Sequence, residues 1–314
     1  MKYVFVCGLH RSGTTILAQS VARLRNCTGL DNTGAPRDEG QFLQDVYPRE
    51  AAYGGVGKFG FAAEAHMTED SPLLTPANVS RLRQSWEPHW DRDKTIRVEK
   101  TPSNLLKTRF LQAGFPNAYF VVIKRHPVPV SLASQKWSRT PLHNLLEHWL
   151  RCYEIFDLDR EHLNRVYEVA YEEFVKSPER HLDAIAKFIG TERSSSVEGE
   201  VTDGHNRQYF ERWTRMLRGS PFKSYYRCIV RTYEKRFRQH DYSLVPLSPE
   251  PAFSPNGEGA IPRSLAQVLY LGADIQSVLW RAETGFRRVA RPIVRHYWPG
   301  KVKTNPQQLG ASED

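Results

Sequence analysis

The sequence predicts an α/β fold in which helices flank a parallel β-sheet. Continuous apolar runs at 3–7 and 119–123, and a similar strand-like run at 166–170, are typical of buried parallel strands. Segments with apolar residues every three or four positions lie between and after these runs, as expected of helices that cover a sheet. Strands that alternate with helices favour a doubly wound parallel sheet, whose ligands bind beyond the carboxyl ends of the strands.

The elements follow one another along the chain. Gly8 bounds the first strand, and a helical apolar pattern runs over 16–24. A second helix is predicted over 142–156, where apolar and aromatic residues recur at helical spacing. A third is predicted over 182–189 and is closed by Gly190.

The chain divides into a domain and an extension. Residues 1–247 form the predicted domain, and 248–263, rich in Pro, Gly and Ser, form a linker. Residues 264–314 read as a basic amphipathic helical extension with a disordered C-terminus. We expect the extension to pack on the domain or on a second subunit in a homodimer. The alternative is that 264–298 contacts an anionic membrane surface.

Composition limits the class of partner. The chain has 314 residues, a net charge of +9 and a pI near 9.4, which favours anionic partners such as nucleotides, nucleic acid or anionic membrane. The four cysteines form no CxxC pair, so no zinc cluster is indicated. No signal peptide or apolar stretch of about 18 residues is seen, and we expect a cytoplasmic protein.

A glycine-spaced loop at 8–15 follows the first strand and opens the first helix. This context predicts a phosphate site, because backbone N–H groups at a helix N-terminus point at an anion and Gly13 permits a close approach. Thr14 stands where nucleotide triphosphatases carry a lysine. The positive charge is instead supplied by Arg11.

A second basic stretch ends the strand at 119–123. Arg125 precedes Pro127, which can start a helix, and its planar guanidinium is suited to phosphate. Ser131 and Ser134 follow on one face of that helix.

These motifs resemble those of the sulfotransferase family. Residues 11–15, Arg-Ser-Gly-Thr-Thr, match the family's 5′-phosphosulfate loop, so the resemblance assigns Arg11, Ser12, Gly13, Thr14 and Thr15 to the donor 3′-phosphoadenosine-5′-phosphosulfate (PAPS). It implies a three-layer sandwich like that of P-loop NTPases, release of the product 3′-phosphoadenosine-5′-phosphate (PAP), and no required metal, because Arg11 and Lys100 supply positive charge.

The resemblance also implies how the 3′-phosphate is held. Arg125 matches the family's arginine, whose partner serine normally stands eight residues later, at the position that Ala133 occupies here. We expect Pro129 to delay the helix start and bring Ser134 into place, with Ser131 as the alternative. Arg207, in a late basic and aromatic stretch, is a further candidate for the 3′-phosphate.

Catalytic residues are expected between the two phosphate motifs. Residues 97–102, Arg-Val-Glu-Lys-Thr-Pro, resemble the family stretch whose lysine stabilises the leaving group, which implies that role for Lys100, aided by Arg11. The acceptor hydroxyl needs a base, and carbohydrate and tyrosine sulfotransferases, which the chain resembles more closely than the cytosolic type, use a glutamate in a place comparable to Glu39. His66 and His126 are the alternatives.

The expected function is therefore sulfuryl transfer from PAPS to a hydroxyl. The expected acceptor is a carbohydrate or a lipid, with a peptidyl tyrosine as the alternative, and no nucleic acid partner is expected. A P-loop kinase or NTPase is one alternative, which would need a Mg²⁺-binding carboxylate. A non-catalytic module that binds membrane or nucleic acid through its basic extension is the other.

Overall fold

A computed structural model describes residues 1–193 and 206–246 of the chain. The predicted linker at 248–263 and the predicted extension at 264–314 lie outside the described residues. The described residues all belong to the predicted domain at 1–247.

Five parallel strands form one sheet in the order β2-β3-β1-β4-β5. Strand β1 lies at the centre, with Val4 opposite Val98 of β3 on one side and Tyr119 of β4 on the other. The expected parallel sheet is confirmed. The strand bounds are β1 Lys2–Gly8, β2 Cys27–Gly29, β3 Ile96–Lys100, β4 Ala118–Lys124 and β5 Val166–Ala170.

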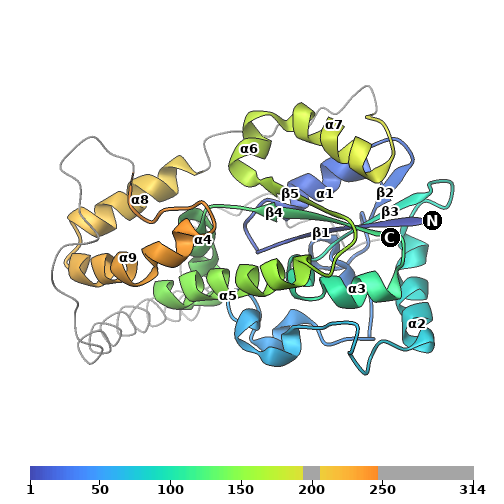
Figure 1. Ribbon diagram of the computed structural model, residues 1–314, viewed down its shortest axis with the longest axis horizontal. Coiled ribbons are helices and arrows are strands. Elements are labelled where there is room, and N and C mark those ends of the chain that lie inside the picture. The colour runs from blue at the N-terminus through green and yellow to red at the C-terminus, as the bar shows by residue number, and fades with distance from the viewer. Residues whose placement is uncertain (194–205, 247–314) are drawn as a thin grey trace, which may run out of the picture. The chain divides into compact units, whose positions relative to one another are not determined.

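Helices cover both faces of the sheet, which gives the predicted three layers (Figure 1). One face carries α1 (Thr14–Ala22), α6 (Tyr171–Lys176) and α7 (Pro178–Ile189), and the other carries α2 (Pro76–Trp86), α3 (Thr108–Gly114) and α5 (Leu142–Arg160). Beyond the carboxyl end of β4 lies α4 (Pro127–Ser138), packed against α5 and α8 (Arg207–Arg218); α8 in turn packs on α9 (Lys223–Arg238).

Alternating side chains of β1 build the two cores. Val4 and Val6 pack with Leu17 of α1 and Ile185 of α7 in one buried cluster. Phe5 points to the opposite face, where its ring contacts the rings of Trp86, Phe115 and Phe120. A central strand that is buried on both faces explains the continuous apolar run from which it was predicted.

Short 3-10 turns recur in the segment between β2 and β3, and one more follows β3. They are Pro36–Asp38, Gly40–Phe42, Glu50–Tyr53, Phe59–Phe61, Ala63–Ala65, Glu87–His89 and Pro102–Leu106. This segment carries the predicted Glu39.

The helix start indicated by Pro127 is confirmed, but the delay expected from Pro129 is wrong. Helix α4 begins at Pro127, with the His126 side chain accepting the N–H of Val128 as its cap. Pro129 lies in the first helical turn, where the missing N–H is not needed, so it does not delay the helix. Pro129 therefore gives no reason to prefer Ser134 over Ser131 as the serine that contacts the 3′-phosphate.

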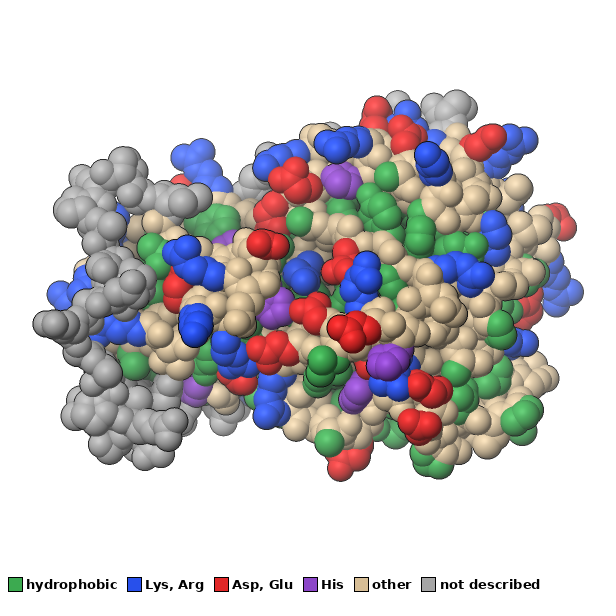
Figure 2. Space-filling model, in the orientation of Figure 1, with side chains coloured by type: hydrophobic (Ala, Val, Ile, Leu, Met, Phe, Trp, Pro, Cys, Tyr) green, Lys and Arg blue, Asp and Glu red, His purple; other side chains and the backbone are tan. Residues whose placement is uncertain are grey.

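Within residues 1–193 and 206–246, every helix is too short or too polar to cross a membrane. Figure 2 shows basic and acidic side chains interspersed over the face in view, with hydrophobic side chains in small separate groups. The four cysteines, Cys7, Cys27, Cys152 and Cys228, are buried free thiols.

Candidate active site

Three of the predicted motifs meet at one edge of the sheet. Strand β1 ends at Gly8 and leads into the loop at 8–15, and its neighbours β3 and β4 end at Lys100 and Lys124. Val6 pairs with Lys100, and Gly8 pairs with Ile123. Because parallel strands present their carboxyl ends together, Lys100 and Arg125 lie on either side of the loop.

The loop is shaped by left-handed backbone. Gly13, the residue before α1, has φ 95°, and a Cβ there would lie 2.7 Å from the ring of Tyr171, so only glycine fits. Arg11 also has a positive φ, of 70°. No side chain caps α1, which leaves the N–H groups of its first turn open to an anion. Ser12 and Thr14 are buried, whereas Arg11 and Thr15 are exposed.

Arg125 is a buried cation beside this loop, with 6% of its surface exposed. Its Nη1 donates to the Arg11 carbonyl at 2.6 Å, and its Nε and Nη2 donate to Asn206 Oδ1 at 2.9 and 2.6 Å. The guanidinium also stacks on the ring of Tyr171, and burial lowers its pKa. Among residues 1–193 and 206–246, no carboxylate forms an ion pair with Arg125.

Glu39 and Lys100 form a buried pair on the other side of the loop. The Lys100 Nζ lies 3.2 Å from Glu39 Oε1 and donates at 2.9 Å to the carbonyl of Arg37. Only 3% of Glu39 and 5% of Lys100 are exposed. The structure thus brings together the predicted base and the predicted leaving-group cation.

A chain of buried polar groups continues from this pair. The second oxygen of Glu39 accepts from Gln41 Nε2 at 2.8 Å, and Gln41 Oε1 accepts the N–H of Glu50 at 3.1 Å. The Glu50 carboxylate lies 2.9 Å from Nε2 of His10, which follows the loop's first residues. The carboxylate of Glu39 is therefore held from both sides, by Lys100 and by Gln41.

Glu99 anchors the segment that carries Glu39. Its carboxylate accepts the N–H of Gly40 at 3.0 Å, the hydroxyl of Thr101 at 2.5 Å and the amide of Asn104 at 2.7 Å. Burial raises the pKa of Glu99 to about 7, although its hydrogen bonds oppose this shift.

Both candidate serines of α4 are buried and face the start of the loop. Ser131 and Ser134 line the same small cavity, next to Leu9 and His10. Within the described ranges the Ser131 hydroxyl has no hydrogen-bond partner. Ala133, at the position where the resemblance places the serine, is also buried.

The alternative bases have other partners. His66 Nε2 lies 2.9 Å from the carboxylate of Asp159, in the last turn of α5 before the chain reaches the amino end of β5. Burial lowers the pKa of His126 to about 4, and both its ring nitrogens are bonded, one to the N–H of Val128 and one to the Ser243 carbonyl at 3.0 Å. The contacts of His66 and His126 therefore do not favour either histidine as the base that acts beside Lys100.

Arg207 lies in the first turn of α8, exposed, and pairs with Glu211 at 2.9 Å. The residue before it, Asn206, is the one that contacts Arg125. Of this stretch, sequence reasoning selected Arg207 and missed Asn206, whose role depends on a contact across 81 residues.

Trp137 is a further residue that sequence reasoning missed. It lies near the end of α4 with 48% of its surface exposed, and the guanidinium groups of Arg11 and Arg37 lie 4.9 and 4.3 Å from its ring centre. Trp137 thus links the loop to the segment that carries Glu39. An exposed tryptophan in a helix gave no signal in the sequence alone.

Within the described ranges, no three His, Cys, Asp or Glu side chains are grouped so that they could hold a metal ion. Arg11, Lys100 and Arg125 carry positive charge at this edge of the sheet.

Comparison with protein families identifies one match. The family model described as "Sulfotransferase family" matches residues 4–195, more than half of the chain. That range contains the loop, Glu39, Lys100 and Arg125. No curated protein matches the chain.

Several solved structures are similar at low identity. A sulfotransferase domain from the curacin biosynthetic pathway is 16% identical, with a TM-score of 0.46 over 77% of this chain and 98% of that one. A sulfotransferase domain from the Synechococcus PCC 7002 olefin synthase is 18% identical, with a TM-score of 0.43 over 87% and 94%. Retinol dehydratase in complex with retinol and PAP is 13% identical, with a TM-score of 0.30 over 88% and 82%.

Proposed function

The chain belongs to the sulfotransferase family, and on that premise we propose that it transfers a sulfuryl group from PAPS to an acceptor hydroxyl. The observation that carries the proposal is the buried Glu39–Lys100 pair, which lies beside an open phosphate loop at the carboxyl edge of the sheet. A base and a cation are the two groups that such a transfer needs at the reacting centre.

The donor would be held at both of its phosphate ends. The backbone of 12–15 and the side chain of Arg11 are suited to the 5′-phosphosulfate, since α1 is uncapped. Arg125 is suited to the 3′-phosphate because it is a buried guanidinium without a carboxylate partner among the described residues. A buried cation of this kind is stabilised by an anionic ligand. Ser131 or Ser134 would add a hydroxyl, and Ser131 has the free one.

The chemical step is an in-line displacement at sulfur. The acceptor oxygen forms a bond to sulfur while the bond from sulfur to the bridging oxygen of the phosphosulfate breaks. The hydroxyl proton passes to Glu39, and Lys100 stabilises the negative charge that develops on the bridging oxygen. Gln41 and the Arg37 carbonyl keep these two side chains in place.

A P-loop kinase is not favoured. Kinases of that class hold the β- and γ-phosphates with a lysine directly after the second loop glycine, and Thr14 occupies that position here. The family match agrees with the sulfuryl-transfer proposal instead.

The test is transfer of labelled sulfate from PAPS to a panel of hydroxyl acceptors. We expect transfer by the wild-type protein and a fall of about 10²-fold or more in kcat for Lys100→Ala, since an electrostatic contact to the developing charge is lost. Lys187→Ala, at an exposed lysine of α7, is the matched control and should keep wild-type activity. Equal turnover by Lys100→Ala and the control would remove the proposed role of Lys100.

A further inference from the structure

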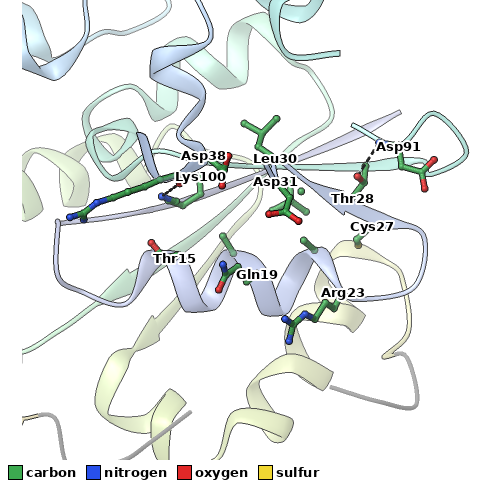
Figure 3. A pocket seen from close by; sticks show the side chains of 15 residues that line it. Thr15, Gln19, Arg23, Cys27, Thr28, Leu30, Asp31, Asp38, Asp91 and Lys100 are labelled. Atoms are coloured by element: carbon green, nitrogen blue, oxygen red, sulfur yellow. Dashed lines mark hydrogen bonds between the residues drawn. The ribbon is translucent and has the colours of Figure 1, made fainter. Parts of the chain in front are cut away.

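A groove of about 390 Å³ opens beside the proposed catalytic pair (Figure 3). At one end it is lined by Thr15, Arg37 and Lys100, and it continues along α1 past Gln19 to Arg23. Its size is near the lower limit of small-molecule sites, which span roughly 300–1,000 Å³. The groove therefore leads from the reacting centre and has room for a small acceptor.

The floor of the groove is made of small apolar side chains. Ala18 and Ala22 of α1 face Val98 of β3 and Cys27 of β2. Gly29 allows α1 and β2 to approach closely, because a Cβ there would lie 2.8 Å from the Cβ of Ala22. These small side chains offer contact to C–H groups of a ligand.

The rim of the groove is polar, with three carboxylates. Asp31, Asp38 and Asp91 line it together with the Gln19 amide and Thr28. Arg23, Arg37 and Lys100 line the groove as well, so its acidic and basic side chains balance in number. A lining with both signs of charge offers hydrogen-bond acceptors and donors without favouring an anion or a cation, which suits a neutral acceptor.

We propose that this groove binds a neutral polyhydroxylated acceptor, of the carbohydrate type, and presents one hydroxyl to Glu39. Carboxylates and an amide oxygen accept hydrogen bonds from neighbouring hydroxyls, while the apolar floor contacts the C–H face of the ring. The inference rests on the proposed function, because it takes the end of the groove at Lys100, whose Nζ pairs with Glu39, as the reacting centre.

The first test fills the groove. Gln19 is exposed on α1, so Gln19→Trp should place an indole in the groove without disturbing the core. Gln84→Trp, at an exposed glutamine of α2 outside the groove, is the matched control. With lactose, cellobiose and trehalose as acceptors, we expect kcat/KM to fall about tenfold or more for Gln19→Trp only. The reason is that one or two contacts between the groove and the sugar are lost.

The second test reverses a charge at the rim. Asp31 is exposed, and Asp31→Lys should lower kcat/KM for the neutral sugars, because a hydrogen-bond acceptor is lost, and raise it for a methyl glucuronide, whose carboxylate the new ammonium group attracts. Asp70→Lys, at an exposed aspartate outside the groove, is the control and should leave both values unchanged.

The outcomes separate this inference from the proposed function. Failure to bind PAP and to transfer sulfate to any acceptor would overturn the proposed function itself. If PAP binds, the groove proposal is overturned by transfer only to a long-chain alcohol or a tyrosine peptide, by no transfer to the neutral sugars, or by neutral-sugar transfer that Gln19→Trp leaves unchanged.

Discussion

Lys100 Nζ lies 3.2 Å from Glu39 Oε1, across 61 residues of sequence, in a pair that is almost fully buried. Lys100 ends strand β3, next to the central strand β1, whereas Glu39 stands between two short 3-10 turns. Removing one partner of a buried pair leaves the other charge uncompensated, so such pairs are tightly constrained. Here both partners lie beside the phosphate loop, where their charges can act on a bound donor and acceptor.

The first prediction concerns the proposed base. Glu39→Gln keeps the shape of the side chain but cannot accept a proton, so kcat for sulfuryl transfer should fall about 10²-fold or more. PAP affinity, measured by calorimetry, should stay within about twofold. Glu64→Gln, at an exposed glutamate, is the control. A Glu39→Gln enzyme with normal turnover would show that another group takes the proton.

The second prediction concerns Gln41 as a positioning residue. Gln41→Met retains the length of the side chain but removes the hydrogen bond to Glu39 Oε2. Because the base is then less well oriented, kcat should fall about tenfold while KM for PAPS stays unchanged. The assay is run well below the melting temperature of the variant. If the KM for PAPS rises while kcat is preserved, Gln41 only supports the fold.

The third prediction concerns pH and the carboxyl group of Glu99. Its pKa is raised from 4.5 to about 7 in the folded protein. Between these values the folded state holds a proton that the unfolded state has lost, so this group makes the free energy of unfolding fall as pH rises. The slope is at most about 1.4 kcal/mol per pH unit.

Glu99→Gln should remove this dependence. The Asn104 Oδ1, which has no partner among the described residues, can accept from the new amide. Urea denaturation at pH 5 and pH 8 should therefore show the variant gaining stability relative to the wild type as pH rises. The same pH dependence in both proteins would mean that Glu99 ionises normally.

The fourth prediction concerns the stacking of Arg11 on Trp137. An exposed cation–π contact contributes about 0.5–1 kcal/mol, so Trp137→Ala should weaken PAP binding by a factor of about two to five. Phe61→Ala is the matched control, because the exposed Phe61 ring carries Arg151 at 5.3 Å in a similar pair outside the loop. Unchanged PAP affinity in Trp137→Ala would show that Arg11 is positioned without the ring.

The sequence allowed the central strands and the phosphate loop to be predicted, because a strand buried on both faces is apolar throughout. Strand β3 was missed as a strand since Arg97, Glu99 and Lys100 interrupt its apolar pattern. All three are buried, and their charges are satisfied by distant partners such as Glu87, Gly40 and Glu39. Only the folded topology brings those partners together.

The same limit applies to the contacts of the site. The loop, Lys100 and Arg125 were each selected from local patterns and a family resemblance. The contacts of Asn206 with Arg125, and of Trp137 with Arg37, join segments far apart in the chain and have no local pattern. Pro127 indicated where α4 begins, but Pro129 does not delay the helix, so the proline spacing gave no ground for choosing between Ser131 and Ser134.

The central claim is that the edge beside Arg125 recognises the 3′-phosphate of PAPS, and calorimetric titration with PAP and with 5′-AMP tests it most directly. A charge-assisted contact contributes about 1.5–3 kcal/mol, so PAP should bind roughly 10- to 100-fold more tightly than 5′-AMP. Arg125→Ala should abolish this difference, whereas Arg180→Ala, at an exposed arginine of α7, should preserve it. Equal affinity of the wild-type protein for the two nucleotides would contradict the claim.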